Sequence, residues 1–559
     1  MLDVLSRCQR ARVCEYTRND RKLVTPSMIG SEPSDAWVES VGNERILHLM
    51  GTDVVMESGL RTTSNSGIPT EVRCQDGIAV VRLPLPEDLA FDESVEAVVV
   101  PNAYELRKDP RRIVDNVMRL RRAAGFNRLL YLSGLGEPST VSILTYMGVD
   151  LFDDSLPRAA GLSGIRLIPE AEISTGEDES DGNVWVMEQE LEKVRIFIKA
   201  DRLRELVDQR APSEPTSVAL LRIYDDVGYE YAEETVSFTG CRFSCNTTQA
   251  LRRPDIKSYK RRMSEYRKPE HKRVLLLLPC SAKKPYHISK SHKAFSSAIH
   301  TAPHDTLVQE VIVTSPLGAV PRELDAFYPA NSYDIPVTGE WKPEEKAFIR
   351  SMIGDIIAQG WDKVICHLGE DYELVEGLAD MECTVVGDST SPASLQNLDK
   401  ALRDATKGME PVDYLIDRNA QMLNMLRFQF GPEAADLLMD GNTYAIGKFP
   451  YFKLFREEDN KKIQLGMFTP ERGGISLTIE GAQILADGGY PTIEIMDFEI
   501  KGNLFAVGVV KADPSIHVGD EAIAVCNGKV RVVGVAMMCG REMTDLKRGI
   551  AVKTRHKVN

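Results

Sequence analysis

The sequence predicts a multidomain α/β protein: a parallel α/β sheet or barrel at 1–270, a second parallel α/β domain at 271–400, a small α+β unit at 401–487 and a small β-barrel at 488–559. Three observations predict this class. Apolar runs alternate with helical stretches in the first domain, and the alternation starts again after a basic helix at 254–268. Beyond the third unit only short strands with turn residues remain. The 559 residues suffice for four units at roughly 100–200 residues each.

The elements of the first domain follow from its apolar pattern. The stretch Pro110–Gly125 starts with proline, ends with glycine and repeats apolar residues at helical spacing, which predicts an amphipathic helix. Around it, strands are predicted at "GIAVVRLPL", "EAVVVPN", "NRLLYLSG" and "VDLF", with a second helix at "PSTVSILTYMG". The stretch 184–211 is predicted to be largely helical. This order of strands and helices favours parallel pairing.

The second domain repeats the pattern with more apolar strands. Strands are predicted at "KRVLLLLPC", "VQEVIVTSP", "DKVICHLG" and "CTVVGDS". Helices are predicted between them at "SHKAFSSAIH", "KPEEKAFIRSMIGDIIAQGW" and "DYELVEGLAD". Strands that are apolar throughout are typical of a parallel sheet buried on both faces.

The last two units have a different character. A helix pair is predicted at "PVDYLIDRNAQMLNMLRFQFG", followed by strands and a closing helix in a small α+β unit. The final residues give only short strands, and the turn at Asn527–Lys529 predicts a β-hairpin. This pattern favours a small β-barrel.

Composition limits the partners of the protein. The formal net charge of −15 disfavours nucleic acid for the chain as a whole, but basic runs at 251–273 and 547–559 can bind phosphates locally. The ten cysteines form no Cys-x-x-Cys pair, and the close pair Cys241 and Cys245 has no second pair nearby, so we expect no metal site. No segment approaches the ~20 apolar residues of a membrane span, and the N-terminus lacks a signal-peptide core. We therefore expect a cytoplasmic protein.

Reactive side chains follow the strands of the second domain. In open parallel sheets, ligands bind outside the carboxyl ends of the strands, and four predicted strands here end in polar loops. Cys280 comes directly after the first of these strands and is a candidate nucleophile if a neighbouring cation lowers its pKa. The alternative is a buried thiol that acts as a small apolar residue. The neighbouring side chains that could activate it, hold a phosphate or move protons are Lys283, Lys284, Tyr286, His292 and His367.

The loop "PCSAKKPYHISKSH" resembles the signature of the archaeosine synthase family. That signature is Pro-Cys, three residues, Lys-Pro-Tyr, two residues, Ser, two residues, His. All seven fixed positions match, at Pro279, Cys280, Lys284, Pro285, Tyr286, Ser289 and His292. The resemblance implies catalytic roles for Cys280, Lys284, Tyr286, Ser289 and His292.

Most of the remaining chain resembles tRNA-guanine transglycosylases, in the same order along the sequence. The stretch "GVDLFDDS" is similar to the barrel strand that carries their catalytic aspartate, which maps to Asp153. The stretch "LSGLG" is similar to the loop that lines their base pocket. The resemblance implies a TIM-barrel-like domain at 1–270, with a base pocket formed by Ser133, Gly134, Gly136 and Asp153.

Residues 401–487 resemble the accessory domain of archaeal transglycosylases, and 488–559 resemble a PUA domain, an RNA-binding barrel. RNA recognition by such a domain would rest on backbone contacts and shape. The candidate residues for binding tRNA are Lys547, Arg548, Lys553 and Arg555.

The sequence also departs from the transglycosylases. We find neither the Ser-Gly-Gly-Phe-Gln-like segment that supplies their other aspartate nor their cysteine-rich zinc motif. The archaeosine synthase resemblance implies a different reaction, on a tRNA that carries 7-cyano-7-deazaguanine (preQ0) in its D arm. An amine from free lysine, or from glutamine, would add to the nitrile without a cofactor. A separate radical-SAM enzyme would then cleave the adduct.

Two places for this chemistry remain open. Cys280 could add to the nitrile first, in the second domain, with Tyr286 or His292 as proton donor. Alternatively, the amine could attack directly in the first domain, with Asp153 as base or orienting group. Base exchange and a non-catalytic tRNA-binding scaffold are the rival functions, and a homodimer is the one assembly that we consider.

Overall fold

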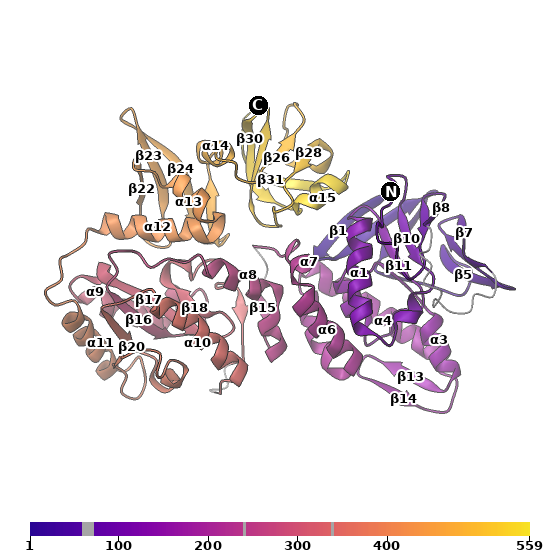
Figure 1. Cartoon of the computed structure of the whole chain (residues 1–559), viewed down its shortest axis with the longest axis horizontal. Coiled ribbons are helices and arrows are strands. Elements are labelled where there is room, and N and C mark those ends of the chain that lie inside the picture. The colour runs from indigo at the N-terminus through magenta and orange to yellow at the C-terminus, as the bar shows by residue number, and fades with distance from the viewer. Residues whose placement is uncertain (59–71, 239–241, 337–339, 559) are drawn as a thin grey trace. The chain divides into compact units, whose positions relative to one another are not determined.

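The computed structural model of the protein describes residues 1–58, 72–238, 242–336 and 340–558. The chain forms two compact units (Figure 1). Unit 1 consists of Met1–Val236, Phe505–His517 and Met538–Ala551. Unit 2 consists of Ser237–Leu504, Val518–Met537 and Val552–Asn559.

A six-stranded sheet forms the centre of unit 1. Its order is β4-β12-β11-β10-β9-β8, and all neighbours are parallel except β8 and β9. The bounds are β4 Ser27–Ile29, β12 Leu151–Asp153, β11 Leu129–Leu132, β10 Ala97–Val100, β9 Ile78–Val80 and β8 Arg73–Gln75. The predicted strand–helix–strand order is therefore confirmed for β10, β11 and β12.

Different elements cover the two faces of this sheet. Val98, Val100, Leu130 and Leu132 face a helical layer. That layer consists of α1 Pro110–Ala124, α2 Val141–Tyr146, α4 Ser180–Lys199, α5 Leu203–Arg210, α6 Pro215–Val227 and α7 Tyr229–Glu233. The alternate residues, such as Val99 and Tyr131, pack instead against antiparallel strands from the start of the chain.

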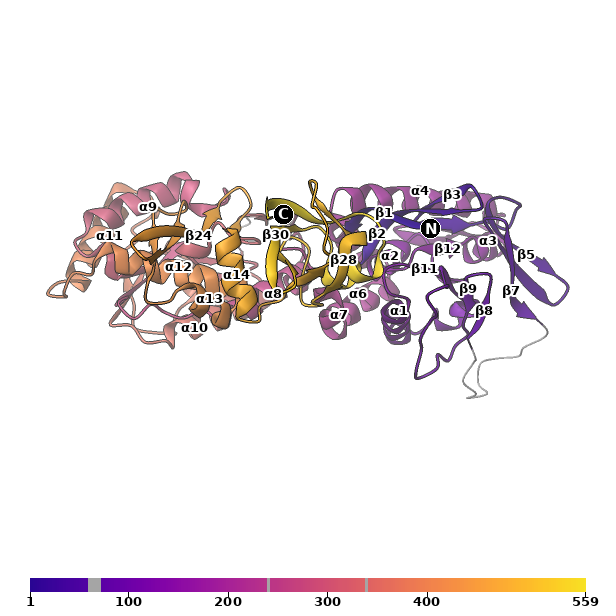
Figure 2. The same cartoon turned by 90° about the horizontal axis from the view of Figure 1, so that it is seen from above.

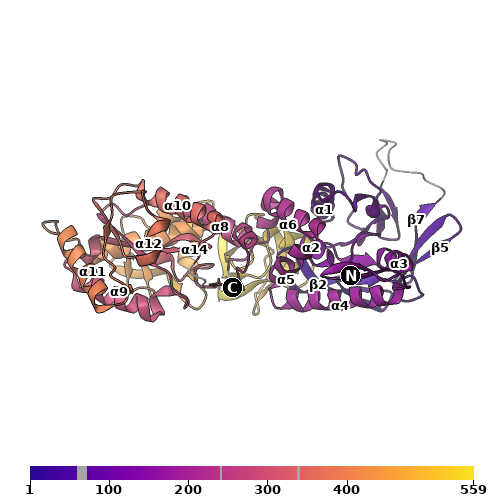
Figure 3. The same ribbon diagram turned by 90° about the horizontal axis from the view of Figure 1, so that it is seen from below.

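Two antiparallel sheets supply those strands. The first contains β1 Leu2–Cys8, β2 Ala11–Arg18 and β3 Arg21–Thr25, and the second contains β5 Ala36–Val41, β6 Glu44–Leu49 and β7 Thr52–Ser58. The second sheet packs against the central sheet at its base and projects from the body of unit 1 (Figure 2 and Figure 3). The remaining elements are α3 Ser155–Leu162 and the hairpin β13 Ile165–Ile168 and β14 Ala171–Ser174.

The eightfold barrel expected for 1–270 is not what unit 1 contains. Among residues 1–58 and 72–238 the central sheet has five parallel strands, and it ends at β4 and β8. The physical reason is that α4, α5, α6 and α7 follow one another without intervening strands, so the strand–helix repeat stops at α3. The face that a closed barrel would enclose is covered by the antiparallel sheets.

A buried ion cluster joins the first strands to this sheet. Asp150 accepts hydrogen bonds from Arg12 Nε and Nη2, both at 3.0 Å, from Arg121 Nη2 at 2.9 Å and from the backbone N–H of Leu130 at 2.9 Å. Asp150 is 2 % exposed. The two guanidinium groups hold the pKa of this carboxyl below its usual range despite the burial.

Unit 2 is built on a five-stranded sheet of order β18-β17-β16-β20-β21. The bounds are β18 Gly318–Pro321, β17 Val308–Thr314, β16 Val274–Pro279, β20 Lys363–Cys366 and β21 Glu382–Cys383. Leu276 of β16 faces helices α9 Lys290–Thr301 and α11 Pro392–Ala405, which lie side by side (Figure 3). Leu275 and Leu277 face the other layer, with α8 Pro254–Met263 and α10 Pro343–Ile357. The predicted burial on both faces is confirmed.

Three details of this sheet differ from the prediction. β18, expected as loop, pairs antiparallel with β17, so the sheet is mixed. The helix expected at "DYELVEGLAD" is only a 3₁₀ turn at Gly369–Leu374, because Gly377 has a φ of 76°, which ends helical geometry. The strand expected at "CTVVGDS" is reduced to the two residues of β21.

The rest of unit 2 begins with helix α12 Tyr414–Phe430 and helix α13 Pro432–Leu438. The stretch 411–431, predicted to form a helix pair, contains the single helix α12, and α13 lies beyond it. The two helices precede a four-stranded antiparallel sheet of β22 Thr443–Ile446, β23 Lys453–Glu458, β24 Lys461–Thr469 and β25 Gly474–Leu477, and then α14 Ile479–Asp487. No helix in the described part of the chain is long and apolar enough to cross a membrane.

The C-terminal residues form a six-stranded sheet of order β27-β31-β30-β29-β26-β28. The bounds are β26 Ile493–Ile495, β27 Leu504–Phe505, β28 Val509–Ala512, β29 Glu521–Cys526, β30 Lys529–Ala536 and β31 Ile550–Lys557; α15 Gly540–Asp545 lies between β30 and β31. The predicted hairpin is confirmed at β29 and β30. Asn527 and Gly528 in its turn both have positive φ.

Candidate functional site

The carboxyl end of the unit 1 sheet gathers three of the four predicted base-pocket residues around one carboxylate. Asp153 ends β12, and Ser133 and Gly134 follow β11. Asp153 Oδ2 accepts hydrogen bonds from Tyr131 OH at 2.7 Å, from Ser133 Oγ at 2.8 Å and from the N–H of Gly134 at 2.8 Å. Its Oδ1 accepts from the N–H of Ser155 at 3.1 Å and from the Ser155 hydroxyl.

These five donors saturate the Asp153 carboxylate, which offers about four lone-pair sites. The side chain is 5 % exposed. A nucleophilic carboxylate needs a free lone pair directed at its substrate, and Asp153 has none to offer. The arrangement fits a group that fixes the loop after β11 rather than one that attacks a sugar carbon.

Two further residues lie at this edge and were missed from the sequence. Arg45 of β6 donates to Ser133 Oγ at 2.8 Å and to the Pro101 carbonyl at 3.3 Å. Tyr104 donates its backbone N–H to the Ser133 carbonyl, and its ring is half exposed. Tyr104 follows β10 just as Ser133 follows β11, so the strand-end rule could have found it. No local signal marks Arg45, which comes from a separate antiparallel sheet.

Gly136, the fourth predicted pocket residue, serves close packing. Its φ is 138°, and a Cβ there would lie 2.6 Å from the ring of Phe152. Gly134 likewise has a φ of 69°, and a Cβ there would lie 2.9 Å from Tyr104 Cβ. The loop after β11 can therefore follow this path only with glycine at both positions.

In unit 2, the motif residues Cys280 and Lys284 lie near one another beyond the end of β16. The Cys280 thiol is partly exposed, and burial of its sulfur raises its pKa, although the Lys284 charge and a hydrogen bond with Thr314 act in the opposite direction. Burial lowers the pKa of Lys284, whose ammonium lies 4.1 Å from the ring centre of Tyr333. The thiol is therefore protonated at neutral pH, which weakens it as a nucleophile.

Three other motif residues are buried and make hydrogen bonds within unit 2. The Tyr286 hydroxyl bonds with the hydroxyls of Tyr333 and Thr314, and burial raises its pKa well above the usual value. Ser289 caps α9 by accepting a hydrogen bond from the N–H of His292 at 3.3 Å. His292 is buried, and its Nδ1 accepts from Arg322 Nη2 at 2.8 Å. These contacts support positioning roles for all three side chains.

His367 is also held by other groups. Its Nδ1 lies 2.7 Å from Thr384 Oγ1, and its Nε2 lies 2.8 Å from the Ser389 carbonyl. Neither ring nitrogen is left to activate Cys280. Cys241 lies outside the described residues, and within the described part of the chain no three His, Cys, Asp or Glu side chains form a group that could hold a metal ion.

Replacing His292 with glutamine is expected to reduce the acid sensitivity of unit 2. Burial and the Arg322 charge lower the pKa of His292 to about 3, from about 6.5 in an unfolded chain. The unfolded chain therefore binds one more proton between these values. This contribution to stability is complete above about pH 6.5 and falls by about 1.4 kcal/mol per pH unit as the pH decreases toward 3. Urea unfolding between about pH 7 and pH 5 checks this. Identical losses in wild type and variant would contradict it.

The four predicted tRNA-binding residues of the C-terminal sheet differ in their contacts. Arg555 is paired with buried Glu521 and donates to the Leu477 carbonyl at 3.2 Å. Arg548 pairs with Asp3 at 2.9 Å. Lys547 and Lys553 have no ion pair with any residue that the structure describes. The lysines are thus available for phosphates, whereas Arg555 stabilises the fold.

Comparison with known proteins defines the class and then the family. Residues 493–558 match the PUA domain family, and residues 256–402 match the family described as "Domain of unknown function (DUF5591)". The PUA match assigns the chain to the class of proteins that carry an RNA-binding PUA domain. The chain is 30% identical to an archaeosine synthase of Haloferax volcanii, over 99% of this chain and 98% of that protein. It is 32% identical to an archaeosine synthase subunit alpha of Thermoplasma acidophilum, over 83% and 88%.

The chain therefore belongs to the archaeosine synthase family, and it is an enzyme. A more distant relative is a tRNA-guanine(15) transglycosylase of Methanobrevibacter smithii, 23% identical over 85% of this chain and 70% of that protein.

Proposed function

We propose that the protein adds the amine of free lysine to the nitrile of preQ0 already present at position 15 of tRNA. A carbon–nitrogen bond forms between the amine and the nitrile carbon, and one π bond of the nitrile breaks. A proton moves from the amine to the former nitrile nitrogen, which gives an amidine without a leaving group or a change of oxidation state. Membership of the archaeosine synthase family supports the tRNA substrate and the pathway.

The single observation that carries the choice of site is the saturated Asp153 carboxylate. Its five donors remove the lone pair that base exchange would need, and they fix Ser133 and Gly134 at the carboxyl end of the sheet. We place the deazaguanine base at this end, against the exposed ring of Tyr104 and near the Arg45 guanidinium. An aromatic face and a fixed rim of donors suit a planar, polar base.

Thiol catalysis at Cys280 is the second candidate mechanism. A thiolate would add to the nitrile to give a thioimidate, and the amine would then displace the thiol. The close pair of Cys280 and Lys284, with the lowered pKa of that lysine, favours this candidate. The raised pKa of Cys280 weighs against it. We therefore propose that the chemistry takes place in unit 1. The motif of unit 2 would then position other groups or bind tRNA.

Mass spectrometry of the tRNA nucleosides tests the reaction. Wild-type protein, tRNA carrying preQ0 and free lysine should yield a nucleoside heavier by one lysine. Glutamine in place of lysine should yield none. Release of preQ0 with incorporation of labelled guanine would instead identify a transglycosylase. Binding of tRNA without either product would identify a scaffold. We propose that a separate radical-SAM enzyme then consumes the lysine adduct. We also propose that the protein forms a homodimer, which a measurement of its molecular mass in solution can test.

Replacing Lys547 and Lys553 together with alanine is expected to weaken tRNA binding without affecting the fold. Each lost phosphate contact should lower the slope of log K against log salt by about one unit. Arg555→Ala should instead destabilise the protein, because it removes one of the two cations that pair with buried Glu521 and leaves Arg472 as the other. Binding titrations at several salt concentrations check the first statement. An unchanged slope in the double variant would place the RNA contacts elsewhere.

A further inference from the structure

Unit 1 contains a cavity to which only one predicted site residue, Gly136, contributes. Its volume is about 480 Å³, within the range of about 300–1,000 Å³ for small-molecule sites. Its walls come from helix α1 and the segment before it, the loop after β11, helices α2 and α3, the hairpin β13–β14 and the start of α6. Leucine, isoleucine and alanine side chains form much of its surface. The cavity therefore suits a ligand with an aliphatic body.

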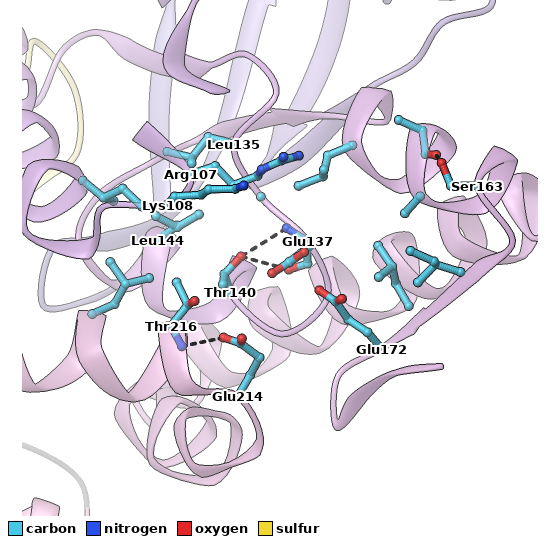
Figure 4. A pocket seen from close by; sticks show the side chains of 18 residues that line it. Arg107, Lys108, Leu135, Glu137, Thr140, Leu144, Ser163, Glu172, Glu214 and Thr216 are labelled. Atoms are coloured by element: carbon cyan, nitrogen blue, oxygen red, sulfur yellow. Dashed lines mark hydrogen bonds between the residues drawn. The ribbon is translucent and has the colours of Figure 1, made fainter. Parts of the chain in front are cut away.

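Charged side chains of both signs stand at the polar part of this cavity. Arg107 and Lys108 lie along one side, and Glu137, Glu172 and Glu214 group on the other (Figure 4). No ion pair joins any of the five to a residue in the described part of the chain. Glu214 caps α6 through the N–H groups of Thr216 and Ser217 but has no cation. Separated, unpaired charges around an apolar cavity indicate a ligand that carries both signs.

The numbers of positive and negative side chains around the cavity indicate which charges the ligand carries. Two cations and three carboxylates complement a molecule with two ammonium groups and one carboxylate. A free dibasic amino acid has this pattern, with an aliphatic chain between its ends. Glutamine has only one ammonium group, and a simple diamine has no carboxylate.

The cavity also adjoins the candidate base site through one loop. Ser133 and Gly134 bind Asp153, and the next residues, Leu135, Gly136 and Glu137, line the cavity. The segment Tyr104–Lys108 makes the same connection, because Tyr104 binds the Ser133 carbonyl and Arg107 and Lys108 line the cavity. A ligand here would lie next to the elements that hold the base.

We propose that this cavity is the binding site for the dibasic amino acid that donates the amine, an inference that rests on the proposed function. Arg107 and Lys108 bind its carboxylate, the aliphatic wall holds its chain, and the three glutamates bind its ammonium groups. Burial and the carboxylates of Glu172 and Glu214 raise the pKa of Glu137. Arg107 and a hydrogen bond from Ser139 act in the opposite direction. An ammonium group beside Glu137 would lower this pKa and displace a proton.

Isothermal titration of the full-length protein with lysine, without tRNA, tests this site. We expect Glu137→Gln and Arg107→Ala each to weaken lysine binding about tenfold or more. Glu188→Gln, a matched change on the exposed face of α4 outside the cavity, should leave the affinity unchanged. Norleucine and 1,5-diaminopentane, which lack one charged end each, should bind more weakly than lysine. At mildly acidic pH, titrations in two buffers should detect proton release in wild type and its loss in Glu137→Gln.

The outcomes separate this inference from the proposed function. Lysine binding that is unchanged in both cavity variants, or an adduct formed with an unchanged KM for lysine, would overturn the cavity assignment and leave the reaction standing. Binding that depends on Glu137 and Arg107, in a protein that forms no adduct with any amine, would support the cavity and overturn the reaction. Conservative Glu137→Gln and exposed Arg107→Ala both leave the core intact, so loss of folding will not obscure the result.

Discussion

Asp153→Asn is expected to lower the rate of lysine addition to preQ0-tRNA by about 100-fold. The asparagine amide has one acceptor oxygen, so it cannot accept the five hydrogen bonds that Asp153 accepts, and its NH₂ group would face a donor. The loop that carries Ser133 and Gly134 would shift by a fraction of an ångström. A shift of this size would misalign a bound base, so it would lower the rate of lysine addition rather than the affinity for tRNA.

Steady-state kinetics with preQ0-tRNA measure this effect, and tRNA binding is measured in parallel. Asp154→Asn is the matched control, because it makes the same change one residue later. Asp154 accepts hydrogen bonds from Ser31 and Arg158 rather than from the Ser133 loop. A wild-type rate in Asp153→Asn would show that the carboxylate does not organise the reaction.

Asp150→Ala is expected to destabilise unit 1 by about 3–5 kcal/mol. The carboxylate pairs with Arg12 and Arg121, which are both buried, and its removal leaves both guanidinium groups without an ion-pair partner among the described residues. Urea unfolding followed by far-ultraviolet circular dichroism measures the loss.

The control for Asp150→Ala is Asp181→Ala. Asp181 forms an ion pair with Arg158, and the Asp181 carboxylate is 97% exposed. Pairs of this kind contribute roughly 0–1 kcal/mol. Equal stability losses in the two variants would mean that the buried cluster is unimportant for the fold.

Local rules predicted much of the architecture and part of the site. Helix α1 begins after Asp109, which caps it, and ends at Gly125 with a φ of 63°, as the sequence indicated. The rule that ligands bind at strand ends led to Cys280, whereas the resemblance to the transglycosylases led to Asp153. In the structure Asp153 is the last residue of the parallel strand β12, and Cys280 directly follows the parallel strand β16.

The remaining features depend on contacts between distant segments. Arg45 reaches Ser133 from a sheet that no local pattern assigns to this edge. Residues from several separate segments of unit 1 line the cavity, and its charged residues show no regular spacing in the sequence. The expected barrel was wrong because the number of parallel strands depends on where helices α4 to α7 pack. The sequence also could not show the roles of Tyr286 and His292, because burial raises the pKa of Tyr286, and burial and the Arg322 charge lower the pKa of His292.

A comparison of Cys280→Ala and Asp153→Asn tests whether the nitrile chemistry takes place in unit 1. Each variant is used in a single-turnover reaction with preQ0-tRNA and lysine, followed by mass spectrometry of the nucleosides. We expect Cys280→Ala to form the lysine adduct still and Asp153→Asn to form very little. Loss of the adduct in Cys280→Ala, with normal formation in Asp153→Asn, would instead assign the reaction to the thiol of unit 2.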